Sequence, residues 1–188
     1  MKPTFGFTLI ELLVTMAVAA VIVTWAVPNF RTMITNNRVS SQANSLLVAV
    51  NTARSAAVSR GTPVTVCAST DGKTCSQSAN WATGWIVFTD GDSGTPGVVD
   101  GSDQIIRVWP ALAGKSALTG SEIDGTQSVV STLTYMRYLP SGLLDNAPAS
   151  GDQYRLYLEP PKPCRGNQAR NIDINPVGRP AAAAASCT

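Results

Sequence analysis

An α+β fold is predicted for this 188-residue chain: one long N-terminal helix followed by a small antiparallel β domain. Three observations predict it. Residues 7–27 form an apolar run whose one charged residue is Glu11. Apolar residues then recur at spacings of three and four as far as Val58, which is typical of an amphipathic helix. After Gly61 the pattern changes to short β-branched segments separated by turn signals.

The predicted helix extends from residue 7 to residue 60. Its apolar run of 21 residues would span roughly 30 Å as a helix, the thickness of a bilayer core, so residues 7–28 are expected to cross a membrane. Pro28 is expected to kink the helix, because proline removes a backbone donor and clashes with the preceding turn. Residues 29–60 form the amphipathic half, and Gly61 with Pro63 ends it. Residues 61–188 are then the globular domain.

Short segments rich in β-branched and aromatic residues predict the strands of this domain. We expect residues 84–89 to form a buried strand and residues 104–109 to be its hairpin partner. Short connections favour antiparallel pairing. The alanine run 181–185 is expected to be an edge segment or a tail held by Cys187. The other predicted strands are 64–68, 129–139, 154–158 and 171–175.

The four cysteines suggest two disulfides in an exported domain, with three possible connectivities. The local pairing, Cys67 with Cys75 and Cys164 with Cys187, is the most economical. A zinc site is the alternative interpretation. The sequence contains no histidine and no Cys-x-x-Cys pair, so zinc is disfavoured, and we expect no metal or cofactor.

The residues Gly6-Phe7-Thr8-Leu9-Ile10-Glu11 resemble the prepilin signal of type IV pilins and type II secretion pseudopilins. The resemblance implies a leader of residues 1–6, removed by prepilin peptidase after Gly6, with methylation of the new amino terminus at Phe7. It also implies that Glu11 pairs with the terminal amine of a neighbouring subunit, as a buried carboxylate requires a partner. An ordinary signal peptide or plain anchor would leave Glu11 unexplained.

This resemblance implies a location as well. The chain would sit in inner-membrane lipid of a bacterium as a single-pass protein with a periplasmic C-terminal domain, and would then move into an extracellular pilus. Later segments are similar to the GspH/FimT branch of the superfamily. They are residues 51–58, 64–67, 81–90 and 175–179.

The branch implies a pilin-like fold, in which a long kinked helix packs on a small antiparallel sheet or sandwich. It also implies a non-enzymatic minor pilin of a type IV pilus, with other pilin subunits as partners. The first alternative is a minor pilin that binds double-stranded DNA for uptake in natural transformation. The second is a tip pseudopilin of a type II secretion system.

The C-terminal region is basic, which suits contact with phosphates even though the net charge is only +2. In FimT proteins a Gly-Arg-x-Arg element carries DNA binding. Here Gly178-Arg179 matches its first half, and position 181 is alanine. The candidate DNA-contacting residues are Lys162, Arg165, Arg170 and Arg179.

Two further patterns resemble functional sites. Residues 91–94, Gly-Asp-Ser-Gly, look like a serine-protease nucleophile motif, but a protein without histidine has no general base for that triad. The acidic loop 90–103 offers oxygen ligands that suit Ca²⁺, or is simply a solvated turn region. Four aromatic residues are expected in the core rather than in a base-stacking site: Trp81, Trp85, Phe88 and Trp109.

Overall fold

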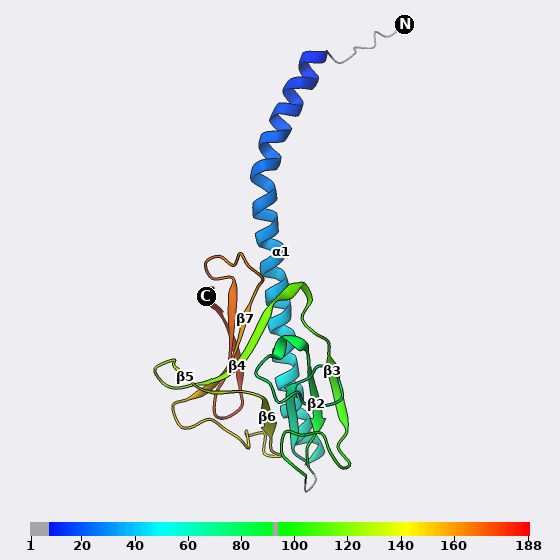
Figure 1. Cartoon of the computed structure of the whole chain (residues 1–188), viewed down its shortest axis with the longest axis vertical. Helices are drawn as coiled ribbons and strands as arrows, with labels where there is room; N and C mark the ends of the chain where they lie inside the picture. The colour runs from blue at the N-terminus through cyan, green and yellow to red at the C-terminus, as the bar shows by residue number, and fades with distance from the viewer. Residues whose placement is uncertain (1–7, 92–93) are drawn as a thin grey trace. The chain divides into compact units, whose positions relative to one another are not determined.

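The computed structural model describes residues 8–91 and 94–188, apart from the side chains of Trp25, Pro28 and Asn29. The chain divides into two compact units at the boundary between Asn37 and Arg38. One helix contributes to both units, and all the strands belong to the second (Figure 1).

Helix α1 extends from Leu9 to Arg60 and comprises 52 residues. The Thr8 hydroxyl accepts a hydrogen bond from the Glu11 backbone N–H at 3.3 Å, so Thr8 caps the first turn. The helix ends where the sequence predicts, and Gly61 donates its N–H to the Ala57 carbonyl at 3.0 Å. It continues through position 28, and the kink predicted there stays a prediction.

In the first unit, apolar side chains are exposed on every face of α1. Leu9 is 78% exposed and Phe30 is 64% exposed, with many others between them. A helix that is apolar all round needs an apolar environment from outside its own unit. Within the described residues, no helix meets the length and apolarity required to cross a membrane.

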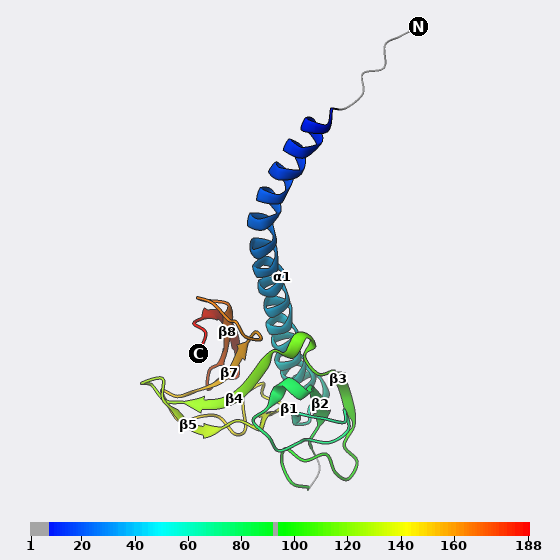
Figure 2. The same ribbon diagram turned by 45° about the horizontal axis from the view of Figure 1, so that its top comes forward.

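The second unit packs residues 38–60 of α1 against two antiparallel sheets (Figure 2). The first sheet has the order β3-β2-β1-β6. Its strands are β1 (Val64–Ala68), β2 (Trp85–Thr89), β3 (Ile105–Trp109) and β6 (Tyr135–Tyr138). As expected, β2 and β3 form an antiparallel pair, with Trp85 opposite Trp109.

The second sheet has the order β5-β4-β7-β8-β9, also antiparallel throughout. Its strands are β4 (Ala117–Ile123), β5 (Val129–Thr132), β7 (Gln153–Glu159), β8 (Ala169–Ile174) and β9 (Pro180–Ala185). Two short 3₁₀ turns connect strands: η1 (Trp81–Thr83) and η2 (Ala113–Lys115). The alanine run is therefore an edge strand of this sheet.

The single strand predicted over residues 129–139 is wrong. The segment divides into β5 and β6, which belong to different sheets. Leu133 lies at the break, is almost fully buried, and its carbonyl accepts a hydrogen bond from the Trp81 indole N–H at 2.8 Å. A buried anchor of this kind lets the chain leave one sheet and enter the other.

Strand β4, which pairs with both β5 and β7, is not predicted by the sequence pattern. Its sequence, ALTGSEI, includes a glycine and a glutamate that strands disfavour. Gly120 is needed because a Cβ there would lie 2.6 Å from both the Leu133 carbonyl oxygen and the Trp81 Nε1 atom. Gly120 therefore lowers the strand propensity of this segment, yet close packing requires a glycine at that position.

The main core lies between α1 and the two sheets. It begins at Val39 and includes Trp81 and Trp85, which are 0% and 1% exposed. Trp109 is partly buried and stacks on Trp85, with ring centroids 6.3 Å apart. The aromatic residues are therefore packing residues, as predicted.

A second, smaller core covers the opposite face of the first sheet. Cys67, Ile86 and Phe88 are fully buried there. Residues that follow β1 and β2 in the chain pack over them, among them Cys75 and Val99. The first sheet is consequently covered on both faces, which explains why β1 and β2 are almost continuously apolar.

Candidate functional site

Glu11 occupies the third position of the first turn of α1, three residues after the capping Thr8. This spacing matches the capping box, in which a glutamate at that position supports the start of a helix. A carboxylate there also interacts favourably with the helix dipole. Glu11 therefore has a local structural role that the sequence analysis missed, although the Thr-x-x-Glu pattern could have revealed it. Gly6 and Phe7 lie outside the described residues.

The cysteines form the two local disulfides. Cys67 is joined to Cys75 and Cys164 to Cys187, with Cα–Cα distances of 5.6 and 5.7 Å. The first closes the loop after β1, where Asp71 accepts hydrogen bonds from the backbone N–H groups of Lys73 and Thr74, both at 2.8 Å. These bonds lower the pKa of Asp71 well below its usual value.

The second disulfide holds the end of β9 against the loop that precedes β8. The Cys187 backbone N–H also donates to the Gly166 carbonyl at 3.0 Å. Within the described residues, one group of three potential metal ligands is close together: Glu159, Cys164 and Cys187. Its two sulfur atoms are bonded to each other, so they do not serve as thiolate ligands.

Two of the four candidate DNA-contacting residues are already engaged within the domain. Lys162 donates to a Glu159 carboxylate oxygen at 3.0 Å and to the carbonyl of Thr188. Arg170 donates to the Ala169 carbonyl at 2.8 Å and reaches the Ser40 hydroxyl of α1 at 3.4 Å. Such bonds orient these cations on the domain surface and leave them less free to meet a phosphate.

Arg165 and Arg179 are exposed, and neither forms an ion pair within the described residues. The fold does not gather the four cations. Lys162 and Arg165 lie in the loop that precedes β8 and Arg170 lies near the start of that strand, whereas Arg179 follows the turn at its far end. Four strand residues separate Arg170 from the turn, which is about 14 Å.

Gly178 has a structural role. Its φ is +76°, and a Cβ would lie 2.5 Å from the Cε1 atom of Tyr138. The Tyr138 hydroxyl donates to the Gly178 carbonyl at 2.9 Å. The Gly-Arg pair at this position is thus explained by a tight turn packed against β6, and the resemblance to the DNA-binding element does not require a DNA role.

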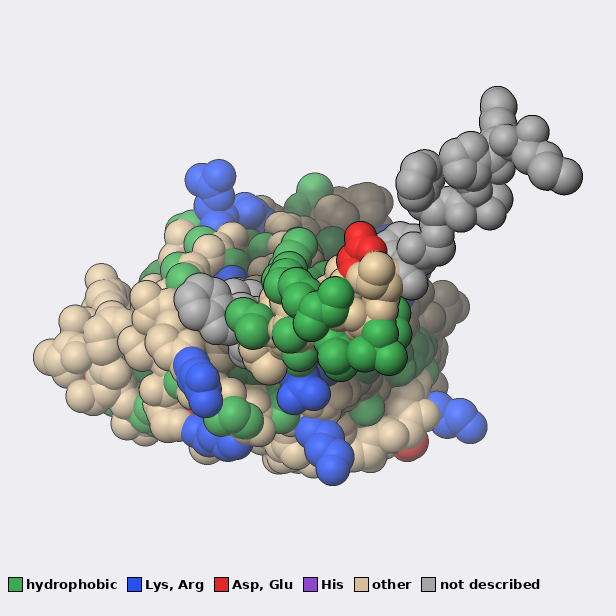
Figure 3. Space-filling view, turned by 90° about the horizontal axis from the view of Figure 1, so that it is seen from above, with side chains coloured by type: hydrophobic (Ala, Val, Ile, Leu, Met, Phe, Trp, Pro, Cys, Tyr) green, Lys and Arg blue, Asp and Glu red, His purple; other side chains and the backbone are tan. Residues whose placement is uncertain are grey.

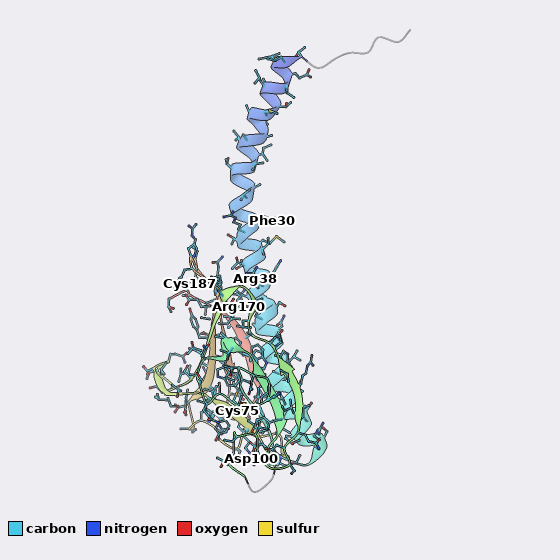
Figure 4. The ribbon with its side chains drawn as sticks, turned by 45° about the vertical axis from the view of Figure 1, so that its right-hand side comes forward. Phe30, Arg38, Cys75, Asp100, Arg170 and Cys187 are labelled. Carbon is cyan, nitrogen blue, oxygen red and sulfur yellow. A yellow bond between two sulfur atoms is a disulfide. The ribbon has the colours of Figure 1, made fainter. Side chains whose placement is uncertain are left out.

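The acidic loop and Arg170 lie at opposite ends of the second unit. In Figure 4, Arg170 and Arg38 lie at the end where Cys187 is found, and Asp100 lies at the other end, beyond Cys75. The view from above in Figure 3 shows Lys and Arg side chains spread around this end and few acidic ones. The acidic loop is therefore distant from Arg170 and Arg38, whereas Arg137 lies beside Asp90 of that loop.

Asp90, at the start of the acidic loop, is 3% exposed and has several partners. It accepts a hydrogen bond from the Thr65 hydroxyl at 2.5 Å and from the Gly97 N–H at 3.0 Å. Its carboxylate also lies 3.1 Å from the Arg137 Nε atom, and Arg137 pairs with Asp145 as well. This buried network ties the loop to β1 and β6, which sequence reasoning did not predict.

The rest of the acidic loop is held by its own bonds. The Asp100 carboxylate accepts from the Thr95 N–H at 3.0 Å, and the Asp103 carboxylate accepts from the Asp100 N–H at 3.3 Å. Asp92 lies outside the described residues. These contacts are those of a folded turn region.

The comparisons with known proteins agree with this architecture. The model of the family described as type II transport protein GspH matches residues 42–178, which is most of the chain. The prokaryotic N-terminal methylation motif matches residues 1–27. The chain therefore belongs to the GspH family and carries the N-terminal methylation motif of pilin-like proteins.

Two solved structures have the same fold, both of the type IV minor pilin FimU from Pseudomonas aeruginosa. The first matches with a TM-score of 0.54 and 18% identity, covering 81% of this chain and 96% of FimU. The second matches with a TM-score of 0.51 and 18% identity, covering 79% and 99%. No curated protein matches the chain. The pilin-like α+β fold is thus confirmed.

Proposed function

We propose that this chain is a minor pilin, a non-enzymatic subunit of a type IV pilus that is cleaved after Gly6 and methylated at Phe7. One observation carries the proposal: a methylation motif leads directly into a helix whose apolar side chains are exposed on all faces. Such a surface requires an apolar environment supplied by lipid or by the helices of other subunits. The fold shared with FimU is consistent with the same role.

The subunit would begin in the inner membrane, anchored through α1, with its β domain in the periplasm. Both disulfides suit that oxidising compartment. Prepilin peptidase would remove residues 1–6, and other pilin subunits would then surround residues 9–34. Glu11, near the start of this surface, would pair with the terminal amine of a neighbouring subunit.

The test is whether a tagged form of the chain is incorporated into pili. An epitope inserted after Gly151, where the surroundings are open and exposed, should leave the fold intact. The tagged chain should appear in sheared pili, and mass spectrometry should show a methylated Phe7 at its amino terminus. Gly6→Val, which blocks removal of the leader, should retain the chain in the membrane fraction.

A tagged chain that is processed but absent from sheared pili would overturn the pilus assignment. Loss of protein secretion on deletion of the gene would then identify a type II secretion pseudopilin. Titration of the purified chain with duplex DNA at low and high salt tests the third function. Binding that Arg165→Ala and Arg179→Ala abolish would identify a DNA receptor, with the strong salt dependence of phosphate contacts.

A further inference from the structure

Four basic residues lie around α1 where the helix enters the second unit. They form the basic collar, which comprises Arg38, Lys115, Arg165 and Arg170. The first three are exposed and Arg170 is half-buried. Within the described residues, none of the four forms an ion pair, and Glu159, which lies at the same end, is already paired with Lys162 at 3.0 Å. The collar therefore presents uncompensated positive charge at this end of the domain (Figure 3).

Arg38 and Lys115 lie together on one side of the helix. The Arg38 guanidinium fills the space that a Cβ at Gly114 would need, so it lies against the residue before Lys115. Gln42, one turn after Arg38, donates to the Ala113 carbonyl at 2.8 Å and holds η2 against α1. These two charges are consequently neighbours, although they are far apart in the sequence.

Arg170 and Arg165 approach α1 from another side. The Arg170 guanidinium reaches the Ser40 hydroxyl at 3.4 Å, and Ser40 points about 200° around the helix from Arg38. The other partners of Arg170 are backbone carbonyls, so its charge is not cancelled. Arg165 follows Cys164, whose disulfide to Cys187 holds this loop at the end of the domain where Figure 4 shows Cys187, Arg38 and Arg170.

The collar is close in the chain to the segment that the proposed function places in the membrane. The exposed apolar side chains of α1 continue as far as Ile34, which is 45% exposed. Arg38 follows after about one helical turn. Because so few residues connect the two, an anchor in lipid would keep the collar at a high effective concentration near the bilayer surface.

We propose that the basic collar binds the anionic phospholipid headgroups of the membrane that holds the chain before assembly. This inference rests on the proposed function, because it requires a chain anchored through α1. Each lysine or arginine close to an anionic membrane surface strengthens the attraction about fivefold. The domain would thus be docked on the bilayer, and a chain that moves into a filament must first break these contacts.

A lipid surface fits the collar better than a nucleic-acid duplex does. The charges are divided between two sides of α1, as the contacts of Arg38 and Arg170 show. A phosphate backbone is normally bound by a continuous patch or stripe of cations, whereas separate lipid headgroups can each diffuse to a separate cation. Arg179, which belongs to the Gly-Arg pair, lies at the far end of β8.

Quenching of a fluorophore by lipid headgroups tests the contact. All four cysteines are in disulfides, so a cysteine at the exposed Asn167, whose carbonyl accepts a hydrogen bond from Arg170, gives one labelling position. The full chain is reconstituted into phosphatidylcholine vesicles with and without phosphatidylglycerol, each with a trace of lipid that carries a quencher on its headgroup. Phosphatidylglycerol should increase the quenching at low salt, and high salt should remove the increase because it screens the charges.

Substitutions in α1 test whether the charge of the collar is responsible. Arg38→Gln should lower the ratio of docked to free domains, measured by the quenching, about fivefold, and Arg38→Lys should preserve it. Arg60→Gln is the matched control. Arg60 is also exposed and lies in the same helix, about 33 Å from Arg38, so its loss should leave the ratio unchanged.

A second labelling position tests which end of the domain meets the lipid. Ser150 is exposed and precedes β7, whereas the loop that holds Asn167 follows that strand. The length of β7 separates the two ends by about 23 Å. A fluorophore on Ser150→Cys should therefore be quenched little in either kind of vesicle.

Flotation of the chain with both kinds of vesicle measures anchoring independently of the collar. A chain that floats, but whose quenching does not depend on phosphatidylglycerol, would overturn the lipid inference and leave the proposed pilus role intact. Equal effects of Arg38→Gln and Arg60→Gln would refute the collar as the contact. Binding of duplex DNA that Arg38→Gln abolishes, without any effect of phosphatidylglycerol, would identify nucleic acid as the partner instead. A chain that does not float would overturn both this inference and the membrane stage of the proposed function.

Discussion

Glu11 lies at the capping-box position of α1 and is proposed to act in assembly as well, and substitutions can separate the two roles. Glutamine keeps the capping-box geometry but removes the charge. If a charged partner is needed, Glu11→Gln and Glu11→Ala should both reduce the tagged chain in sheared pili about tenfold or more, the effect of losing a buried charge pair. Quantitative immunoblotting of sheared and membrane fractions measures this. Wild-type incorporation of Glu11→Gln would leave capping as the role of the residue.

Asp90 and Arg137 form the most buried ion pair described in the second unit. Arg137→Met leaves the Asp90 carboxylate without its cation and should lower the free energy of unfolding by about 3 kcal/mol. Urea titration monitored by tryptophan fluorescence measures the change. The exposed pair of Lys162 with Glu159 is the control, and Lys162→Met should cost less than about 1 kcal/mol. Similar losses in the two variants would contradict the importance of burial.

Two tyrosines should make the domain sensitive to alkaline pH. Burial raises the pKa of Tyr154 to about 12, with Glu122 and Tyr135 adding to the effect, and burial also raises the pKa of Tyr138. Above the ordinary tyrosine pKa of about 10 the unfolded state loses its proton first, so stability falls as pH rises toward 12. Over this pH range, the urea concentration at the unfolding midpoint should fall less steeply with pH in Tyr154→Phe than in the wild type. An unchanged slope would contradict the assignment.

At the scale of single elements, the turn between β8 and β9 depends on Gly178. Gly178→Ala places a methyl group against the Tyr138 ring at a positive φ and should cost about 3 kcal/mol. Gly166→Ala is the matched control, because its φ is +57° but nothing lies within 4 Å, and it should cost only about 1 kcal/mol. Thermal unfolding of both variants measures the two losses of stability. Equal losses would show that backbone strain alone matters.

The elements that sequence reasoning recovered are those with strong local signals. The helix end at Gly61, the buried strand β2 and its partner β3 follow from turn chemistry and apolar runs. Strand β4 was missed because Gly120 serves a contact with Trp81, which is distant in sequence. The break at Leu133 has the same cause, a long-range packing requirement that local propensity does not record.

The arrangement of the candidate site residues could be predicted less completely from the sequence, for a related reason. The motif at Gly6 to Glu11 indicates processing and assembly from local spacing alone. The positions of the four C-terminal cations depend on how β8 and β9 pair, and the sequence does not reveal that one hairpin separates Arg170 from Arg179. The engagement of Arg170 with the Ser40 hydroxyl likewise joins residues 130 positions apart.

At the scale of the whole molecule, the Cys164–Cys187 disulfide joins residues separated by 23 positions and holds the end of the alanine strand. Replacing both cysteines with serine should lower the free energy of unfolding by about 3 kcal/mol. Hydrogen exchange should show that the loss of protection is largest in β9, since β8 is also held by β7. Uniform loss across both sheets would contradict this local effect.

The covered second face of the first sheet has a consequence for the timing of folding. Cys67 is fully buried in that smaller core, and its bond to Cys75 fastens the loop that closes over it. In a reducing cytoplasm the Cys67–Cys75 disulfide would not form. The loop would then pack less firmly over this face of the first sheet. On the proposed route through the periplasm, oxidation after export would complete the cover of this face, so folding and arrival at the site of assembly would be coupled.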